Sequence, residues 1–225
     1  MTALFVTATG TDIGKTFVTA GLIRHLRAAG GSVAAIKPVV SGFDPENWQA
    51  SDPAVLLAAL GRPLTLDEVE GVSPWRFRAP LSPHTAAQRE GRAIAFQEVV
   101  AFCRRAMAAR RGVLLVEGIG GVMVPLDDRH SVLDLMSMLR IPIILVAGSY
   151  VGTLSHTLTA LEVVARRNLD IAALVVSESN GSAASLEDTV ATLQVYAEQL
   201  EVVGIPRLPL GVCEHAAFAR LAALI

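Results

Sequence analysis

The first residues that could do chemistry lie in the stretch TATGTDIGKT, residues 7–16. It ends in Gly14, Lys15 and Thr16, the second half of the phosphate-binding pattern G-x-x-x-x-G-K-[ST]. In that pattern the lysine reaches the β- and γ-phosphates of a nucleotide, and the hydroxyl faces a magnesium ion. The first glycine should fall at position 9, where this chain has Thr9. The spacing alone leaves open a phosphate loop of another shape or a chance GKT.

Lysine itself is rare in this chain, which carries 19 Lys and Arg residues in total but only two lysines, Lys15 and Lys37. A lysine is a compact, mobile point charge, whereas an arginine is a planar fork. A chain that otherwise uses arginine therefore retains lysine where a site demands it. Lys37 follows a predicted strand, so we expect it to act on a ligand; the alternative is an ordinary surface lysine.

Two carboxylates are candidate metal ligands. Glu117 directly follows the apolar run VLLV, and a carboxylate buried there needs a partner, which a metal bound to nucleotide phosphates would supply. Asp52, which precedes Pro53, is either such a ligand or a helix cap, and the local sequence does not decide between the two. The glycines of GIGG at 118–121 would let the backbone approach a ligand closely; a tight turn without a ligand is the alternative.

These residues must be positioned by a regular alternation of apolar runs and helical patterns. The runs at 3–8, 33–40, 112–118, 142–148 and 172–178 predict strands buried on both faces. The stretches at 15–30, 95–112, 131–140, 155–168 and 185–200 predict helices. This order predicts an α/β fold: a doubly wound, mostly parallel sheet with helices on both faces, in one domain over residues 1–225.

In such sheets, ligands bind outside the carboxyl ends of the strands. Four polar stretches follow predicted strands and so qualify as ligand-binding segments: residues 7–16, 37–41, 117–121 and 177–180. We therefore expect these four segments to meet at one edge of the sheet.

Composition excludes several classes of function. The chain has 225 residues, is 52% hydrophobic and 18% charged, and carries a net charge of −2, which is wrong for a disordered protein. It has no basic run, which argues against a nucleic-acid partner. Its apolar runs are too short to cross a membrane and its start does not read as a signal peptide, so we expect a cytoplasmic protein. The distant Cys103 and Cys213 are expected to be inert thiols.

The motifs TDIGKT, KPVVSG, SDP, APLSPH, VEGIGG and GTLSHT follow one another along the chain. In this order and spacing, and over almost the whole chain, they resemble the dethiobiotin synthetases, ATP-dependent enzymes of biotin synthesis with a P-loop NTPase fold. The phosphate loop of that family is one residue longer than the common form, G-x-x-x-x-x-G-K-T. The resemblance therefore places Ala8 where the first glycine stands, with Gly10 supplying flexibility within the loop.

The resemblance implies a role for each motif residue. Lys37 and Lys15 would be catalytic, and magnesium would be held by Thr16, Asp52 and Glu117. The nucleotide would be bound by Thr11, Asp12, Ile13, Gly14, Lys15, Thr16, Phe17, Asp52, Glu117, Gly118, Gly120, Ser177, Pro206, Arg207 and Leu208. The substrate would contact Thr11, Lys37, Ser41, Ser82, Gly118, Gly152 and Ser155.

The implied reaction joins 7,8-diaminononanoate and carbon dioxide, using ATP and Mg²⁺, through a carbamate and a carbamic-phosphoric anhydride. In the implied homodimer, the segment 152–155 of the partner subunit would receive the carboxylate end of the diamine. Ser177 stands where the family has an asparagine that reads adenine. A serine hydroxyl cannot span two atoms of the base, so we predict weaker discrimination among nucleoside triphosphates.

Two other classes share parts of this pattern. Partitioning ATPases carry an additional lysine early in the phosphate loop, at the place of Gly10 in this chain. Amide-forming enzymes of cobalamin synthesis carry an added glutamine-hydrolysing domain, for which this chain has neither the length nor a suitable cysteine motif. Both alternatives are therefore disfavoured.

Overall fold

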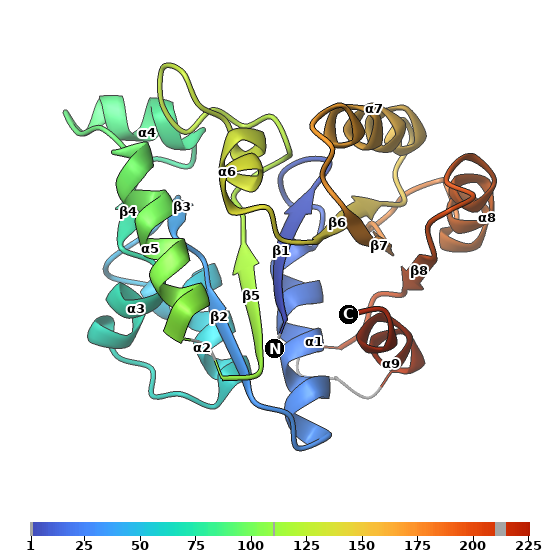
Figure 1. Cartoon of the computed structure of the whole chain (residues 1–225), viewed down its shortest axis with the longest axis horizontal. Coiled ribbons are helices and arrows are strands. Elements are labelled where there is room, and N and C mark those ends of the chain that lie inside the picture. Colours follow the sequence, from blue (N-terminus) through green and yellow to red (C-terminus); the bar gives the residue numbers. More distant parts are fainter. Residues whose placement is uncertain (1, 110, 210–214) are drawn as a thin grey trace.

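The structure is a computed structural model that describes residues 2–109, 111–209 and 215–225. A parallel sheet of six strands forms the centre of this described part (Figure 1). Its order is β2-β5-β1-β6-β7-β8. The strands are β1 (Ala3–Ala8), β2 (Val33–Ile36), β5 (Val113–Glu117), β6 (Ile143–Gly148), β7 (Ile171–Ser177) and β8 (Val202–Ile205). The predicted α/β fold with a mostly parallel sheet is confirmed.

Helices cover both faces of this sheet, and each face has its own hydrophobic core (Figure 1). One face is covered by α1 (Lys15–Ala28), α2 (Asp52–Leu60) and α9 (Ala216–Ala223). The other is covered by α5 (Phe96–Ala109), α6 (Val132–Leu139), α7 (Thr153–Arg166) and α8 (Leu186–Tyr196). Strands buried on both sides explain the nearly continuous apolar runs in the sequence.

The predicted strand over residues 33–40 is wrong in one respect: it is two strands in two sheets. Pro38 has no N–H to donate to a ladder, so pairing with β5 stops after Ile36. The chain then enters β3 (Val39–Ser41), which pairs in parallel with β4 (Trp75–Phe77). The break leaves Lys37 between the two sheets, where its N–H donates to the carbonyl of Val72.

Several short elements lie outside the predicted runs. They are the 3₁₀ turn η1 (Trp48–Ala50), α3 (Leu66–Val72), α4 (Pro83–Arg89), and the α2, β4, β8 and α9 already described. Helix α9 packs on α1, and Phe218 is fully buried beside Gly21 of that helix. The end of the chain that the structure describes therefore completes the core on this face.

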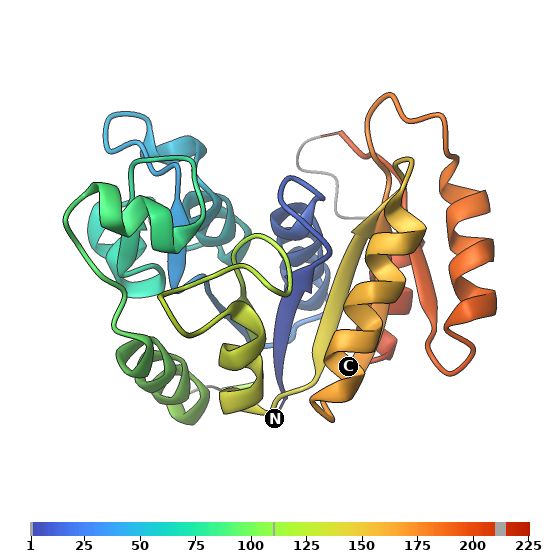
Figure 2. The same cartoon turned by 90° about the horizontal axis from the view of Figure 1, so that it is seen from above.

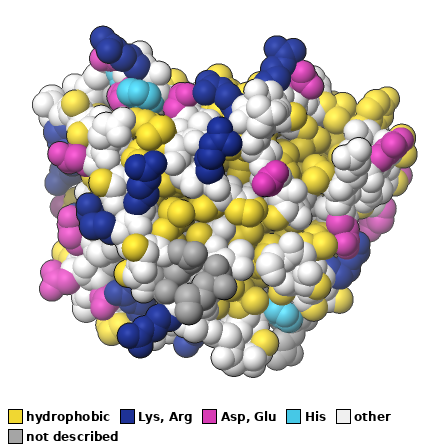
Figure 3. Space-filling model, in the orientation of Figure 1, with side chains coloured by type: hydrophobic (Ala, Val, Ile, Leu, Met, Phe, Trp, Pro, Cys, Tyr) yellow, Lys and Arg dark blue, Asp and Glu magenta, His cyan; other side chains and the backbone are white. Residues whose placement is uncertain are grey.

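All strands of the central sheet run in one direction, so their carboxyl ends share an edge; Figure 2 shows β1 and β6 ending together there. On the face shown in Figure 3, Lys and Arg side chains are scattered among acidic and apolar ones. Among the described residues, no helix has the length and apolarity that a membrane crossing requires. Cys103 is buried, which raises its pKa to about 12 and makes the thiol unreactive; Cys213 lies outside the described residues.

Candidate nucleotide and substrate site

The loop between β1 and α1 forms an anion site. Helix α1 begins at Lys15, as predicted, and no side chain caps its N-terminus, so its first backbone N–H groups face the cavity described below. Gly14 precedes it with a φ of 101°, a conformation that only glycine adopts readily. A side chain at Gly14 would also come within 2.5 Å of the Ser177 hydroxyl oxygen. Both the backbone conformation and the close approach of Ser177 therefore require glycine at position 14.

The departures from the common glycine pattern have a simple reason. Ala8 is the last residue of β1 and pairs with Val146 of β6, so it is extended and requires no glycine. Gly10 does not have a positive φ, and a Cβ added to it would contact only the Ile13 side chain, at 3.4 Å. The turn depends on Gly14, together with a left-handed Asp12 at a φ of 57°.

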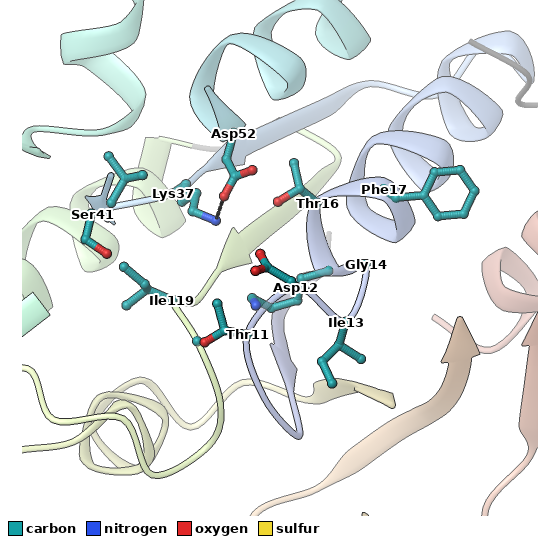
Figure 4. Close-up of a pocket in the computed structure, with 13 residues that line it drawn as sticks. Thr11, Asp12, Ile13, Gly14, Thr16, Phe17, Lys37, Ser41, Asp52 and Ile119 are labelled. Atoms are coloured by element: carbon teal, nitrogen blue, oxygen red, sulfur yellow. Dashed lines mark hydrogen bonds and ion pairs between the residues drawn. The ribbon is translucent and has the colours of Figure 1, made fainter. Parts of the chain in front are cut away.

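A cavity of about 340 Å³ lies against this loop (Figure 4). Residues from the phosphate loop, from the ends of β2 and β5, from β3 and from the start of α2 line it. They are Thr11, Asp12, Ile13, Gly14, Lys15, Thr16, Phe17, Lys37, Val40, Ser41, Asp52, Ile119 and Gly120. Val40 and Ile119 were not among the predicted site residues, although each lies in a segment expected at this edge.

At the centre of the site, the ammonium of Lys37 bridges the carboxylates of Asp52 and Glu117; Figure 4 shows its contact with Asp52. Its Nζ lies 2.5 Å from Asp52 Oδ2 and 2.7 Å from Glu117 Oε1. Lys37 and Glu117 follow neighbouring strands, paired in register at Ile36 and Val116, which brings the two side chains together. The Thr16 hydroxyl donates to the same Glu117 oxygen at 2.7 Å.

Asp52 does not cap helix α2. The N-cap position is Ser51, and Asp52 is the first helical residue. Its carboxylate pairs with Lys37, and it lies in the first turn, where a negative charge also suits the helix dipole. The helix-cap interpretation of Asp52 is therefore wrong, and the carboxylate belongs to the charged centre of the site.

The two lysines differ in their electrostatic environment. Burial and the nearby charge of Lys37 lower the pKa of Lys15 to about 8. Burial alone would also lower the pKa of Lys37, but the carboxylates of Glu117 and Asp52 outweigh it and raise that pKa. Burial favours a protonated Asp52, but the charge of Lys37 and the hydrogen bonds from Lys37 and Thr16 together outweigh it and lower the Asp52 pKa. Lys37 is thus charged at neutral pH, whereas the pKa of Lys15, at about 8, lies close to neutral pH.

The residues predicted to hold magnesium fit that ion. Glu117 is fully buried, and its Oε2 has no hydrogen-bond partner among the described residues. Together with Asp52 and the Thr16 hydroxyl it offers the hard oxygen donors that Mg²⁺ prefers. Within the described part of the chain, no group of three or more His, Cys, Asp or Glu side chains is placed to hold a metal ion.

A second cavity of about 520 Å³ lies on the other side of the phosphate loop. It shares Asp12, Ile13, Gly14 and Phe17 with the first cavity. Its remaining walls come from the segments after β7 and β8: Ser177, Glu178, Ser179, Asn180, Arg207 and Leu208. Pro206 precedes the last two but is not part of the lining. Glu178 and Ser179 were missed as individual site residues, although the stretch 177–180 was expected at this edge.

Four predicted substrate residues lie outside both cavities. Gly118 packs against the side chains of Phe5 and Val132, and its neighbours Ile119 and Gly120 line the first cavity instead. Ser82 caps α4 and shares a hydrogen bond of 2.8 Å with the Thr85 hydroxyl. Gly152 and Ser155 stand at the start of α7, with Gly152 as a left-handed N-cap. A single chain therefore brings together the predicted metal residues and the predicted nucleotide residues other than Gly118 and Pro206, but not these four substrate residues.

Comparison with known proteins agrees with this geometry. The family described as "AAA domain" matches residues 2–211. The ATP-dependent dethiobiotin synthetase BioD of Caulobacter vibrioides is 50% identical over 208 residues, which is 92% of this chain and 93% of the relative. The enzyme of the same name from Acidiphilium cryptum is 49% identical over 178 residues, 79% of this chain and 80% of the relative.

Solved structures show the same fold at low sequence identity. The MinC:MinD complex of Aquifex aeolicus matches with a TM-score of 0.55 at 15% identity, over 98% of this chain and 86% of that one. Cyanthece apo McdA matches with a TM-score of 0.52 at 15% identity, over 100% of this chain and 93% of that one. These likenesses speak to the fold alone, because one fold supports many functions. The sequence relatives, together with the site, show that the chain belongs to the family of ATP-dependent dethiobiotin synthetases, within the AAA domain family of P-loop proteins.

Proposed function

We propose that the chain is a ligase that forms C–N bonds and closes a cyclic urea, converting 7,8-diaminononanoate and carbon dioxide to dethiobiotin with ATP. The observation that carries the proposal is the charged centre at the carboxyl edge of the sheet. Two lysines, two carboxylates and a hydroxyl converge there beside an uncapped helix N-terminus. This arrangement suits the gathering of two anions, a nucleotide phosphate and a carbamate.

The phosphates of ATP would lie on the loop 11–17. The N-terminal N–H groups of α1 and the Lys15 ammonium would neutralise them, and the lowered Lys15 pKa would rise again as the triphosphate binds. The base would occupy the second cavity, with Ile13 and Phe17 against its ring. The two cavities share the phosphate loop, so one nucleotide can span both.

Thr16, Asp52 and Glu117 would hold Mg²⁺. Bound there, the ion would neutralise charge on the β- and γ-phosphate oxygens. It would also compensate the two carboxylates that Lys37 compensates in the structure, and so leave the Lys37 ammonium available to the substrate. The unpartnered Glu117 Oε2 supports this assignment.

The reaction balances with these groups alone. One amine of the diamine attacks carbon dioxide and loses a proton, giving a carbamate. A carbamate oxygen attacks the γ-phosphorus and ADP leaves. The second amine then attacks the carbamoyl carbon and loses a proton, and phosphate leaves with the bridging oxygen as the ring closes. Lys37, Thr11 and Ser41 line the cavity where the carbamate would form, and the positive charge of Lys37 would stabilise it.

The carboxylate end of the diamine would reach the start of α7, residues 152–155, of a partner subunit in a homodimer. Support comes from the position of Gly152 and Ser155: they stand at an uncapped helix N-terminus, outside both cavities of their own chain. Ser82 would lie at the rim of the diamine site, near the loop that leads into α4.

Phosphate release under four conditions tests the proposal. Purified protein with ATP and Mg²⁺ is assayed alone, with diaminononanoate, with bicarbonate, and with both. We expect rapid release only with both, accompanied by one dethiobiotin per phosphate in the mass spectrum. Equal release in all four conditions would identify a simple ATPase and would refute the synthetase proposal. Lys37→Met serves as the control, since it should remove the release that depends on the diamine.

A further inference from the structure

The wall of the second cavity presents a carboxylate whose position is fixed. Glu178 follows β7, and its backbone N–H donates to the carbonyl of Ile205 at 2.9 Å. Its side-chain Oε2 accepts from the backbone N–H of Arg207 at 2.8 Å. Both bonds tie the end of β7 to the segment that follows β8. The Glu178 carboxylate is therefore held against the cavity by backbone groups rather than by a mobile cation.

Neighbouring groups keep this wall rigid. Ser179 and Ser149 exchange hydrogen bonds: each backbone N–H donates to the hydroxyl oxygen of the other, at 3.0 and 3.1 Å. Ser177 is buried at the end of β7 and lies against Gly14 of the phosphate loop. Segment 177–179 is thus fixed to β6, to β8 and to the loop that would bind the phosphates. A group on this wall has a defined distance from a bound nucleotide.

The second carboxylate oxygen of Glu178, Oε1, accepts no hydrogen bond from any other residue that the structure describes. An ionised carboxylate can only accept hydrogen bonds. Ile13, Phe17 and Leu208 add apolar surface to the same cavity, as a flat aromatic ring requires. The cavity therefore combines a place for a ring with a fixed acceptor at its edge.

We propose that Glu178 selects the base of the nucleotide by accepting a hydrogen bond from an exocyclic amine. Adenine and cytosine carry such an amine at corresponding positions, whereas uracil, hypoxanthine and guanine present an oxygen there that the carboxylate repels. Selection then separates ATP and CTP from UTP, ITP and GTP, and it is weak between ATP and CTP. The inference rests on the proposed function, in which this cavity receives the base.

The sharpest test uses pairs of nucleotides that differ at this edge. Dissociation constants of the Mg²⁺ complexes of CTP and UTP, and of ATP and ITP, are measured by calorimetry on the full chain without diamine. A hydrogen bond to a charged group contributes about 1.5–3 kcal/mol, so the base with the amine should bind roughly 10- to 150-fold tighter. Wild-type protein that binds CTP and UTP within about twofold would overturn the proposal.

Two variants separate a selective acceptor from a merely structural one. In Glu178→Gln the single amide oxygen stays with the Arg207 N–H, so the amide NH₂ faces the base and the preference should reverse toward UTP and ITP. In Glu178→Ala the preference should fall to near one without reversal. Glu98→Gln, on the exposed surface of α5, is the matched control and should keep the wild-type ratios. Melting temperatures establish that each variant is folded.

Two outcomes identify a different role. If Glu178→Gln changes the ratio of ATP to 2′-deoxyATP binding and leaves the base ratios unchanged, the carboxylate serves the ribose and the proposal is wrong. Unchanged ratios in both Glu178 variants also overturn it. Binding is measured apart from turnover, so failure of dethiobiotin formation would refute the proposed function and leave base selection standing.

Discussion

At the scale of single residues, the site depends on where each positive charge goes. The Lys37 ammonium forms ion pairs with Asp52 and Glu117. The Lys15 ammonium has no carboxylate within hydrogen-bond distance among the described residues. Burial, together with the nearby charge of Lys37, lowers the pKa of Lys15, and the side chain is left available to an anion. Lysine scarcity and position after a strand predicted that both lysines serve the site. The pairing of Lys37 with Asp52 could not be predicted, because it joins two segments across a break between sheets.

The pKa of Lys15 predicts a pH dependence of ATP binding. Below about pH 8, Lys15 is charged in the free protein. Above about pH 8 it is mostly neutral, so ATP binding must be accompanied by uptake of a proton on Lys15. The ATP dissociation constant should therefore rise by up to about tenfold per pH unit, until the pH reaches the pKa of Lys15 in the complex. Calorimetry between about pH 7 and pH 10 measures this. Lys15→Arg stays charged throughout and should show a flat profile. A flat wild-type profile would contradict the lowered pKa.

The shared carboxylates predict that Lys37 and Mg²⁺ substitute for one another. Lys37→Met removes the cation paired with the buried Glu117 carboxylate. Without Mg²⁺, this should lower the free energy of unfolding by roughly 3 kcal/mol and the Tm by about 6–12 °C. Millimolar Mg²⁺ should restore more of this stability than it adds to the wild type. Thermal unfolding with EDTA and with Mg²⁺ measures the difference. Lys15→Met keeps the Lys37 pair and is the control; equal Mg²⁺ stabilisation of all three proteins would exclude a metal at these carboxylates.

At the scale of elements, hydrophobic runs predicted the central strands because both faces of the sheet are buried. Length and composition were less informative for residues 48–89, where α2, α3 and α4 have nine or fewer residues each and carry little periodicity. Residues 33–40 formed one apolar run, and only the missing N–H of Pro38 divides it. The rule that ligands bind at the carboxyl ends of strands located segments 117–121 and 177–180. It did not single out Glu178, because the position of its carboxylate is set by the backbone N–H of Arg207, which follows β8.

Helix α1 offers a test of element packing. At an exposed position inside a helix, replacing glycine with alanine stabilises the folded protein by up to about 1 kcal/mol. At Gly21, however, a Cβ would lie 2.1 Å from the Phe218 ring, so Gly21→Ala should destabilise the protein by about 1–3 kcal/mol. Gly71→Ala in α3, with no atom near its Cβ, is the control and should be neutral or stabilising. Urea unfolding measures both; stabilisation by Gly21→Ala would show that α9 does not pack on α1 as described.

At the scale of the whole molecule, the parallel sheet collects segments far apart in the sequence at one edge. The phosphate loop follows β1, Lys37 follows β2, Glu117 ends β5, and Glu178 follows β7. In the proposed reaction each part would have its own chemistry: phosphate binding, charge compensation, metal ligation and contact with the base. In the proposed reaction, carbon dioxide, ATP and the diamine therefore all react at this edge in one turnover.

Oxygen-18 transfer from labelled bicarbonate tests this central claim most directly. Carbon dioxide delivers two oxygens to the carbamate; one leaves with the phosphate and the other remains as the carbonyl oxygen of the cyclic urea. Mass spectrometry, performed before the label exchanges with water, should therefore find one labelled oxygen in phosphate and one in dethiobiotin. Unlabelled phosphate would mean that water, not a carbamate, attacks the γ-phosphorus, and it would contradict the account.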